Sequence, residues 1–208
     1  MGTPLQNTYQ SLSRKGYRVY LCATKTDALS VIFTDILTSD LCDKIIGMSH
    51  SETLEQLQLL ERLLPKARNV YFHKPPDTTP EDDRNALRSD YYFLSANAVS
   101  EDGYIVNIDG TGNRVAASCF GPKQVTYVIG RNKIVKTMDD AVDRAIHYAT
   151  LEVAKKYNKD VDRMPCINTG KCSSCHCPVC PGGALLISRK PLFGQKASII
   201  LVDEEMGI

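Results

Sequence analysis

Short apolar segments alternate with longer amphipathic ones along most of this chain, and the alternation predicts the fold. Runs of β-branched and aromatic residues indicate strands, and apolar residues three or four positions apart indicate helices. The predicted strands cover 17–23, 44–48, 69–74, 91–98, 104–109, 124–130, 184–189 and 198–204, and the predicted helices cover 4–15, 26–37, 52–64, 113–120 and 137–157. This order is typical of an α/β protein with a mainly parallel open sheet and helices on both faces.

Local signals refine this outline. Thr26 is predicted to cap the second helix, and Thr137 with Asp140 forms a capping-box-like pair before the last one. An Asp-Gly turn at 102–103 predicts a hairpin, which together with the final pair of strands would make the sheet mixed. The polar, proline-rich segment 75–83, PPDTTPEDD, has no packing pattern and is predicted to be a protruding loop.

The composition is that of a soluble globular protein. The chain has 208 residues, 43% of them apolar and 24% charged, with a net charge of +1. We expect an α/β domain at 1–162, followed at 163–208 by a cysteine-rich segment and the final strands packing on the same domain. The charge balance gives no indication of nucleic-acid binding, and no apolar run reaches the roughly 18 residues of a membrane span. Because the start shows neither a signal peptide nor a myristoylation pattern, the cytoplasm is the expected location.

Polar clusters follow four of the predicted strands, at 49–53, 95–97, 107–114 and 130–133. Ligands of open parallel sheets bind outside the carboxyl ends of the strands. We therefore expect the clusters to meet around one small anionic ligand, a carboxylate or a phosphate. Each cluster also has a plainer interpretation as a turn, a helix cap or a solvated surface. Neither a Walker motif nor a G-x-G-x-x-G fingerprint is present, so the sequence contains no nucleotide motif.

Within these clusters, Asp109 has the chemistry of a general base or of a hydrogen-bond acceptor for the ligand. The alternative is that Asp109 and Gly110 form a turn that caps the following helix, with no chemical role. Arg131 and Lys133 would supply positive charge at the same edge of the sheet. His50 could titrate or donate a hydrogen bond, although a lone loop histidine is more often only solvated.

Five of the eight cysteines lie between Cys166 and Cys180, where C-x-x-C spacing occurs at 172/175 and again at 177/180. Such spacing lets two thiolates bind one metal ion from a single turn of backbone. Tetrathiolate sites hold zinc or an iron–sulfur cluster, so the spacing leaves the metal undecided. The alternatives are a redox-labile disulfide cluster and cysteines without metal. His176 is a further candidate ligand.

The central segment 94–135, LSANAVSEDGYIVNIDGTGNRVAASCFGPKQVTYVIGRNKIV, resembles the core of the lactate utilisation protein (LUD) domain family. The nearest resemblance is to its stand-alone, C-type members, and it extends from the strand near Tyr17 to the last strand. The resemblance implies a Rossmann-like α/β fold similar to the sugar-phosphate isomerase and coenzyme A transferase superfamily. It also implies a role as an oxidoreductase component, beside iron–sulfur partner subunits, in the oxidation of lactate to pyruvate.

The same resemblance implies site residues. The family positions around the pocket correspond to Ser51, Thr53, Asn97, Asn107, Asp109, Gly110, Gly112, Asn113, Asn132 and Lys133. Thr111 and Arg131, from the polar clusters described above, are further candidates for the same site. The family turn before Ser51 is often glycine-rich, whereas this chain has Ser49 and His50 there. A subset of the family carries P-C-x-x-T-G-x-C-x-x-C, and this pattern implies Cys166, Cys172, Cys175 and Cys180 as ligands of an iron–sulfur cluster or zinc, with Cys177 or Cys180 as the fourth.

Two other functions fit the sequence. One is a free-standing isomerase or acyl transferase acting on an anionic substrate, although the central motif offers no Glu as a nucleophile. The other is a binding or scaffold module whose metal only stabilises the C-terminal segment. The sequence leaves open whether the protein is an enzyme, and a symmetric homodimer is the default expectation for such folds.

Overall fold

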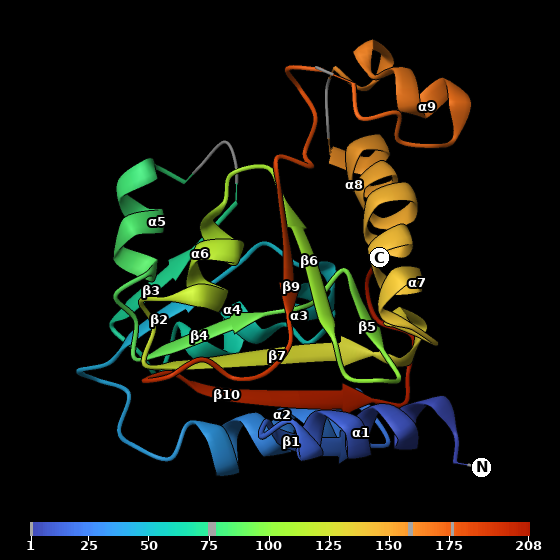
Figure 1. Ribbon diagram of the computed structural model, residues 1–208. Coiled ribbons are helices and arrows are strands. Elements are labelled where there is room, and N and C mark those ends of the chain that lie inside the picture. The colour runs from blue at the N-terminus through green and yellow to red at the C-terminus, as the bar shows by residue number, and fades with distance from the viewer. Residues whose placement is uncertain (1, 75–77, 158–159, 176) are drawn as a thin grey trace.

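Two β-sheets organise the computed structural model, which describes residues 2–74, 78–157, 160–175 and 177–208 (Figure 1). The larger sheet has six strands in the order β1-β10-β7-β4-β2-β3, and every neighbouring pair is parallel. The smaller sheet has the order β8-β5-β6-β9, in which β6 runs antiparallel to both β5 and β9. The predicted α/β architecture with a mainly parallel open sheet is therefore confirmed.

The strands are β1 (Arg18–Cys22), β2 (Ile45–Met48), β3 (Asn69–Phe72), β4 (Tyr91–Leu94), β5 (Ala98–Ser100), β6 (Ile105–Asp109), β7 (Gln124–Gly130), β8 (Ile134–Val135), β9 (Ala184–Ser188) and β10 (Lys196–Val202). The α-helices are α1 (Pro4–Arg14), α2 (Lys25–Val31), α3 (Glu52–Gln56), α4 (Leu59–Leu63), α5 (Pro80–Ala86), α6 (Asn113–Cys119), α7 (Met138–Asp143), α8 (Thr150–Tyr157) and α9 (Pro165–Thr169). Short π-helical segments at Ile32–Ile36 and Arg144–Ala149 extend α2 and join α7 to α8.

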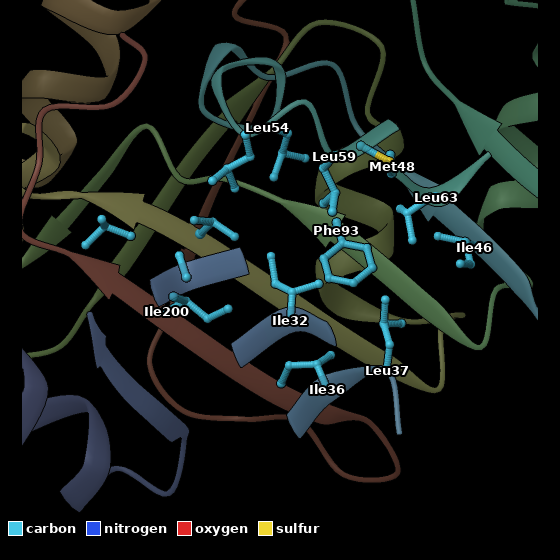
Figure 2. Packing of buried hydrophobic residues seen from close by; sticks show 14 of the residues in the cluster. Ile32, Ile36, Leu37, Ile46, Met48, Leu54, Leu59, Leu63, Phe93 and Ile200 are labelled. Carbon is cyan, nitrogen blue, oxygen red and sulfur yellow. The ribbon is translucent and has the colours of Figure 1, made fainter. Parts of the chain in front are cut away.

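Side chains of the large sheet alternate between its two faces and build two cores. On one face, Phe93 and Ile200 pack against α2 and the α3–α4 pair, as Figure 2 shows for Ile32, Leu59 and their neighbours. On the other face, Tyr92 and its alternating partners pack against α1, α5, α6 and the smaller sheet. Fully burying one such large side chain stabilises the fold by about 1.5–3 kcal/mol, which explains why central strands read as continuous apolar runs.

A third core lies between the smaller sheet and the helical run 138–157. Ala98 and Val106 from the sheet pack against Ala141 and Ala145, whose small side chains let the helix approach closely. The cysteine-rich segment with α9 follows this run and lies beyond the end of α8 (Figure 1). Among the described residues, no helix is long and apolar enough to cross a membrane.

The sheet topology corrects one prediction. The Asp102-Gly103 turn does form a hairpin, but β5 and β6 belong to the smaller sheet rather than to one mixed sheet. The predicted strand 91–98 is divided because the chain leaves the large sheet after Leu94 and enters the smaller one at Ala98. The last two strands also separate: β9 pairs with β6, whereas β10 lies between β1 and β7.

Two helix predictions and one loop prediction change as well. Thr24, not Thr26, caps α2, because only Thr24 has a side-chain acceptor three residues later to complete a capping box. The predicted helix 52–64 is broken at Gln58, whose φ of 52° is left-handed. Within the predicted loop 75–83, residues 75–77 lie outside the described part of the chain, and Thr79 caps α5 ahead of Pro80. The capping box of Thr137 before α7 is confirmed.

Candidate functional site

A cavity of about 390 Å³ lies where neighbouring strands of the large sheet end. Its wall includes residues 49–52 after β2, His73 after β3, 95–97 after β4, Lys133 after β7, and 109–111 at the end of β6. Parallel strands all point their carboxyl ends to the same edge, so segments far apart in sequence meet there. The smaller sheet contributes to the wall through the end of β6.

The structure brings many of the predicted residues to this cavity. Those on its wall are Ser51, Asn97, Asp109, Gly110, Thr111, Asn113 and Lys133. Those that lie off the wall are Thr53, Asn107, Gly112, Arg131 and Asn132.

Thr53 and Asn107 lie directly behind wall residues and hold them in place. Thr53 Oγ1 accepts a hydrogen bond of 3.0 Å from Lys133 Nζ and donates to the Met206 carbonyl at 3.2 Å. Asn107 Oδ1 accepts from the Asn97 backbone N–H at 3.3 Å, while Asn97 Oδ1 accepts from the Ile108 N–H at 2.9 Å. Both residues are therefore supports of the site rather than ligand contacts.

Arg131 and Asn132 face away from the cavity and bind the C-terminal segment. Arg131 Nη1 donates to the Asp203 carbonyl at 3.2 Å. Asn132 Nδ2 donates to the Gly207 carbonyl at 2.8 Å, and its Oδ1 accepts from the Met206 N–H at 2.9 Å. The charge that sequence reasoning placed at Arg131 thus lies outside the site, and Lys133 alone of this cluster reaches it.

Asp109 lines the cavity, but its carboxylate is occupied by backbone amides. Oδ1 accepts from the Thr111 N–H at 3.3 Å, and Oδ2 accepts from the N–H groups of Arg114 at 2.9 Å and Val115 at 3.2 Å. These contacts satisfy otherwise unpaired donors at the start of α6. Gly112 precedes that helix with φ of 87°, a conformation that favours glycine. The geometry favours the helix-cap interpretation of Asp109 over that of a general base.

Lys133 is a buried amine on the cavity wall, only 3% exposed. Its Nζ donates to Thr53 Oγ1 at 3.0 Å and to Ser95 Oγ at 3.1 Å. Burial lowers the pKa of Lys133 to about 7, and the positive charges of Arg144 and Arg114 contribute to the lowering. A lysine that loses its proton near neutral pH can act as a cation, an acid, a base or a nucleophile.

Two polar atoms on wall residues lack partners. Ser49 Oγ and Arg114 Nε are buried, and neither finds a hydrogen-bond partner among the described residues. The Arg114 guanidinium is otherwise fixed, since its Nη2 donates to the Ile108 carbonyl at 2.6 Å. An unsatisfied buried polar group costs about 1–3 kcal/mol, so both atoms are unfavourably placed in the absence of a partner. The sequence contained both residues within polar clusters but gave no signal that singled them out.

His73 lies on the cavity wall and is paired with Asp83, which lies off the wall. His73 Nδ1 lies 2.8 Å and 3.0 Å from the two carboxylate oxygens of Asp83, and Asn113 Nδ2 donates to Asp83 Oδ1 at 3.1 Å. Because a carboxylate accepts the Nδ1 proton, Nε2 is the nitrogen left to exchange protons with a ligand. The sequence analysis missed this pair because it assigned Asp83 to a protruding loop. The position of His73 at the end of a predicted strand was the one signal that could have marked it as a residue of the site.

Glu52 and His50 complete the polar wall. Burial opposes ionisation of Glu52, but hydrogen bonds from Lys156 and from Tyr157 at 2.8 Å lower its pKa overall. His50 Nε2 lies 3.2 Å from Glu55 Oε1, and its ring contacts Tyr157 edge-on. His50 therefore has partners of its own instead of being only solvated.

The cysteine-rich segment forms a small core against α8. Cys166 is buried with Leu151 and Met164, and Cys172 and Cys180 pack against this cluster. Burial raises the pKa of the Cys166 thiol, and the nearby Cys172 thiol raises it further. Cys175 and Cys180 act in the same direction, so the four predicted ligands share one neighbourhood.

Cys177 packs against the same cluster, and its Sγ also contacts the Arg163 carbonyl at 3.7 Å. All eight cysteines are free thiols. Within the described part of the chain, no three His, Cys, Asp or Glu side chains are arranged to hold a metal ion. His176, the further candidate ligand, lies outside the described residues.

These features define an α/β protein with a polar, partly cationic cavity at the carboxyl edge of a parallel sheet. Comparison with known families identifies the class: the model of the LUD domain matches residues 5–180, and the chain belongs to the LUD domain family. This family is associated with lactate utilisation. The recognition made from the central segment is thereby confirmed.

A solved structure supports the fold. A DUF162 family protein from Deinococcus radiodurans, determined by crystallography at 1.70 Å resolution, is similar with a TM-score of 0.50. The match covers 96% of this chain and 95% of that chain at 13% sequence identity, so the likeness concerns the fold alone. No curated protein matches this chain significantly.

Proposed function

We propose that this protein is the ligand-binding component of a lactate-utilisation system, and that its cavity binds a small 2-hydroxy or 2-oxo carboxylate such as lactate or pyruvate. The observation that carries the proposal is the pair of buried, unpartnered atoms, Ser49 Oγ and Arg114 Nε, on the wall that also holds Lys133. A carboxylate accepts hydrogen bonds from a guanidinium and a hydroxyl, and it offsets the charge of a nearby ammonium.

The other wall residues suit the rest of such a ligand. Ser51 makes no capping hydrogen bond through its side chain, although it precedes α3. Its hydroxyl and the Asn97 side chain are suited to a ligand hydroxyl or carbonyl oxygen, since both donate and accept hydrogen bonds. The His73–Asp83 pair would take the hydroxyl proton of a 2-hydroxy acid on oxidation. The proton from the α carbon would be released to solvent, and the two electrons would pass one at a time to iron–sulfur partner subunits.

We also propose a thiolate-bound metal at the C-terminal segment. The donor chemistry fits: four free thiols share one neighbourhood around Cys166, and the Gly182 N–H donates to Cys180 Sγ at 3.4 Å. The ligand set would be Cys166, Cys172, Cys175 and Cys180. An iron–sulfur cluster there would supply one-electron transfer, whereas zinc would only stabilise the segment.

Titration calorimetry with lactate and with pyruvate tests the cavity. Replacing Arg114 by Gln removes a charged donor worth about 1.5–3 kcal/mol, so affinity should fall roughly tenfold to a hundredfold. Arg131→Gln is the matched control because Arg131 lies outside the cavity, and it should bind as the wild type does. Equal affinities for the two variants, or no binding to the wild type, would contradict the proposal.

Metal content and the visible spectrum of anaerobically purified protein test the second site. Bound iron with visible absorption would support a cluster, and zinc without absorption would restrict the metal to a structural role. Cys172→Ser should lose the metal, whereas Cys42→Ser, at an exposed cysteine outside the segment, should retain it. Protein that binds neither metal would refute the site.

A second candidate function is a free-standing isomerase on an anionic substrate. The His73–Asp83 pair favours it, because such chemistry needs a positioned acid–base group that the central motif does not supply. Turnover of phosphosugars, lost in His73→Asn but retained in His147→Asn, would establish this activity in place of the first.

A further inference from the structure

Lys133 combines deep burial with an unusual set of partners. Its side chain is almost wholly enclosed, yet its amine bonds only to hydroxyls of Thr53 and Ser95 in the described structure, and no carboxylate lies within ion-pair distance. Buried lysines are normally paired with an acidic side chain. The two hydroxyls fix Nζ at the cavity wall without stabilising its charge as a carboxylate would.

The charges around Lys133 act in the same direction. Arg114 and Arg144 disfavour the ammonium form, and Glu52, which favours it, opposes them only in part. Burial has the largest effect, and the pKa of Lys133 is near 7. A substantial fraction of the protein therefore carries a neutral amine with a lone pair at neutral pH, which is the state that attacks carbonyl groups.

We propose that Lys133 is a nucleophile that forms an imine with the carbonyl of a small 2-oxo acid bound in the cavity. This inference rests on the proposed function, because it specifies the ligand class of the same site. Nζ attacks the ketone carbon, and the carbonyl electron pair moves to oxygen, which takes a proton to give a carbinolamine. Loss of this hydroxyl as water forms the C=N bond, so the net change is amine plus ketone giving imine plus water, without oxidation or reduction.

The cavity provides what this reaction requires. Arg114 and Ser49 lie on the cavity wall with Lys133, and each carries a donor without a partner that would suit the carboxylate of the 2-oxo acid. Thr53 and Ser95 hold Nζ in one position, so little side-chain freedom is lost on reaction. His73, on the same wall, is available to donate the proton to the departing hydroxyl.

Reductive trapping tests the proposal. The full chain is incubated with pyruvate and cyanoborohydride, and peptides are mapped by mass spectrometry. We expect one carboxyethyl group on Lys133, well ahead of modification at other lysines, and none with lactate, which has no carbonyl. Lys133→Arg keeps a long basic side chain but cannot form the imine and should abolish the adduct. Lys136→Arg, at an exposed lysine three residues away, should leave it unchanged.

The dependence on pH distinguishes Lys133 from surface amines. Trapping at Lys133 should level off above pH 7 and fall about tenfold per pH unit below it, whereas an ordinary lysine keeps gaining reactivity up to its pKa near 10. The other ionisable side chains on this wall are those of His50, Glu52, His73, Asp109, Arg114 and Tyr157. Because Lys133 Nζ bonds to none of these side chains, the midpoint of trapping should belong to Lys133 itself.

Calorimetry with pyruvate separates failure of this inference from failure of the proposed function. Pyruvate that binds without any adduct at Lys133 would overturn the imine and leave the binding function intact. Absence of both binding and adduct would overturn both. If Lys133→Arg fails to fold, the peptide map and pH profile of the wild type decide alone, since indiscriminate labelling of surface lysines refutes the proposal.

Discussion

Replacing Asp109 by Asn separates its two interpretations, as a helix cap and as a general base. Its carboxylate accepts three backbone N–H groups, with Oδ1 serving Thr111 and Oδ2 serving Arg114 and Val115. Asparagine has one acceptor oxygen, so at least one N–H must face an NH₂ group. Hydrogen bonds to charged groups contribute about 1.5–3 kcal/mol. We therefore expect the free energy of unfolding to fall by roughly 2 kcal/mol, equivalent to roughly 4–8 °C in melting temperature for a chain of this size.

Urea and thermal unfolding measure this change directly. Asp203→Asn is the control, because Asp203 is exposed and its contact with Arg131 Nη1 is 3.5 Å long, so its removal should change stability by less than about 0.5 kcal/mol. The capping interpretation would be refuted if Asp109→Asn unfolded at the wild-type midpoint. If that variant were fully stable and yet failed in ligand turnover, Asp109 would instead be the general base that the sequence suggested.

Three further predictions concern stability. Phe93→Ala empties the centre of the core in Figure 2 and should cost about 3–5 kcal/mol, whereas Phe193→Ala, at a fully exposed side chain, should cost almost nothing in the same urea titration. Gln58→Gly relieves a left-handed residue and should raise the unfolding free energy by up to about 1 kcal/mol; a loss of stability would contradict this. Burial opposes the shift at Glu52, but hydrogen bonds, chiefly from Lys156, lower its pKa, so its contribution is present above the usual value of 4.5 and is lost as pH falls below it. The free energy of unfolding of Glu52→Gln should therefore depend less on pH in the acid range than that of the wild type.

The sequence predicted where the cavity would be, because strand ends can be read from periodicity and parallel topology then fixes the edge. Side-chain direction after a strand could not be read in this way. Arg131, Asn132 and Lys133 occupy one 3₁₀ turn, which directs Lys133 inward and the other two toward residues 203–207. Successive residues of such a turn diverge by about a third of a revolution, and only the backbone angles decide which of them faces the ligand.

Contacts between elements that are distant in sequence could not be predicted from the sequence either. The pairing of His73 with Asp83 requires α5 to pack beside the end of β3, although the sequence around Asp83 is polar and rich in proline. The division of 91–98 between two sheets likewise depends on how the chain turns at Ser95, where an apolar run gives no signal of a change in partner. Local propensity was weaker than tertiary packing at both places.

The arrangement of α8 joins the ligand cavity to the cysteine-rich segment. Val153 and Tyr157, four residues apart, line the cavity, while Leu151 and Ala154 pack on Cys166. The segment also reaches the central motif directly, since Pro181 lines the cavity and a Cβ on Gly110 would lie only 3.0 Å from the Pro181 backbone. A side chain at position 110 would push the two apart, which gives a physical reason for glycine there. The cysteine segment and the cavity share these contacts, so the metal and the ligand proposed above would be expected to affect each other's binding.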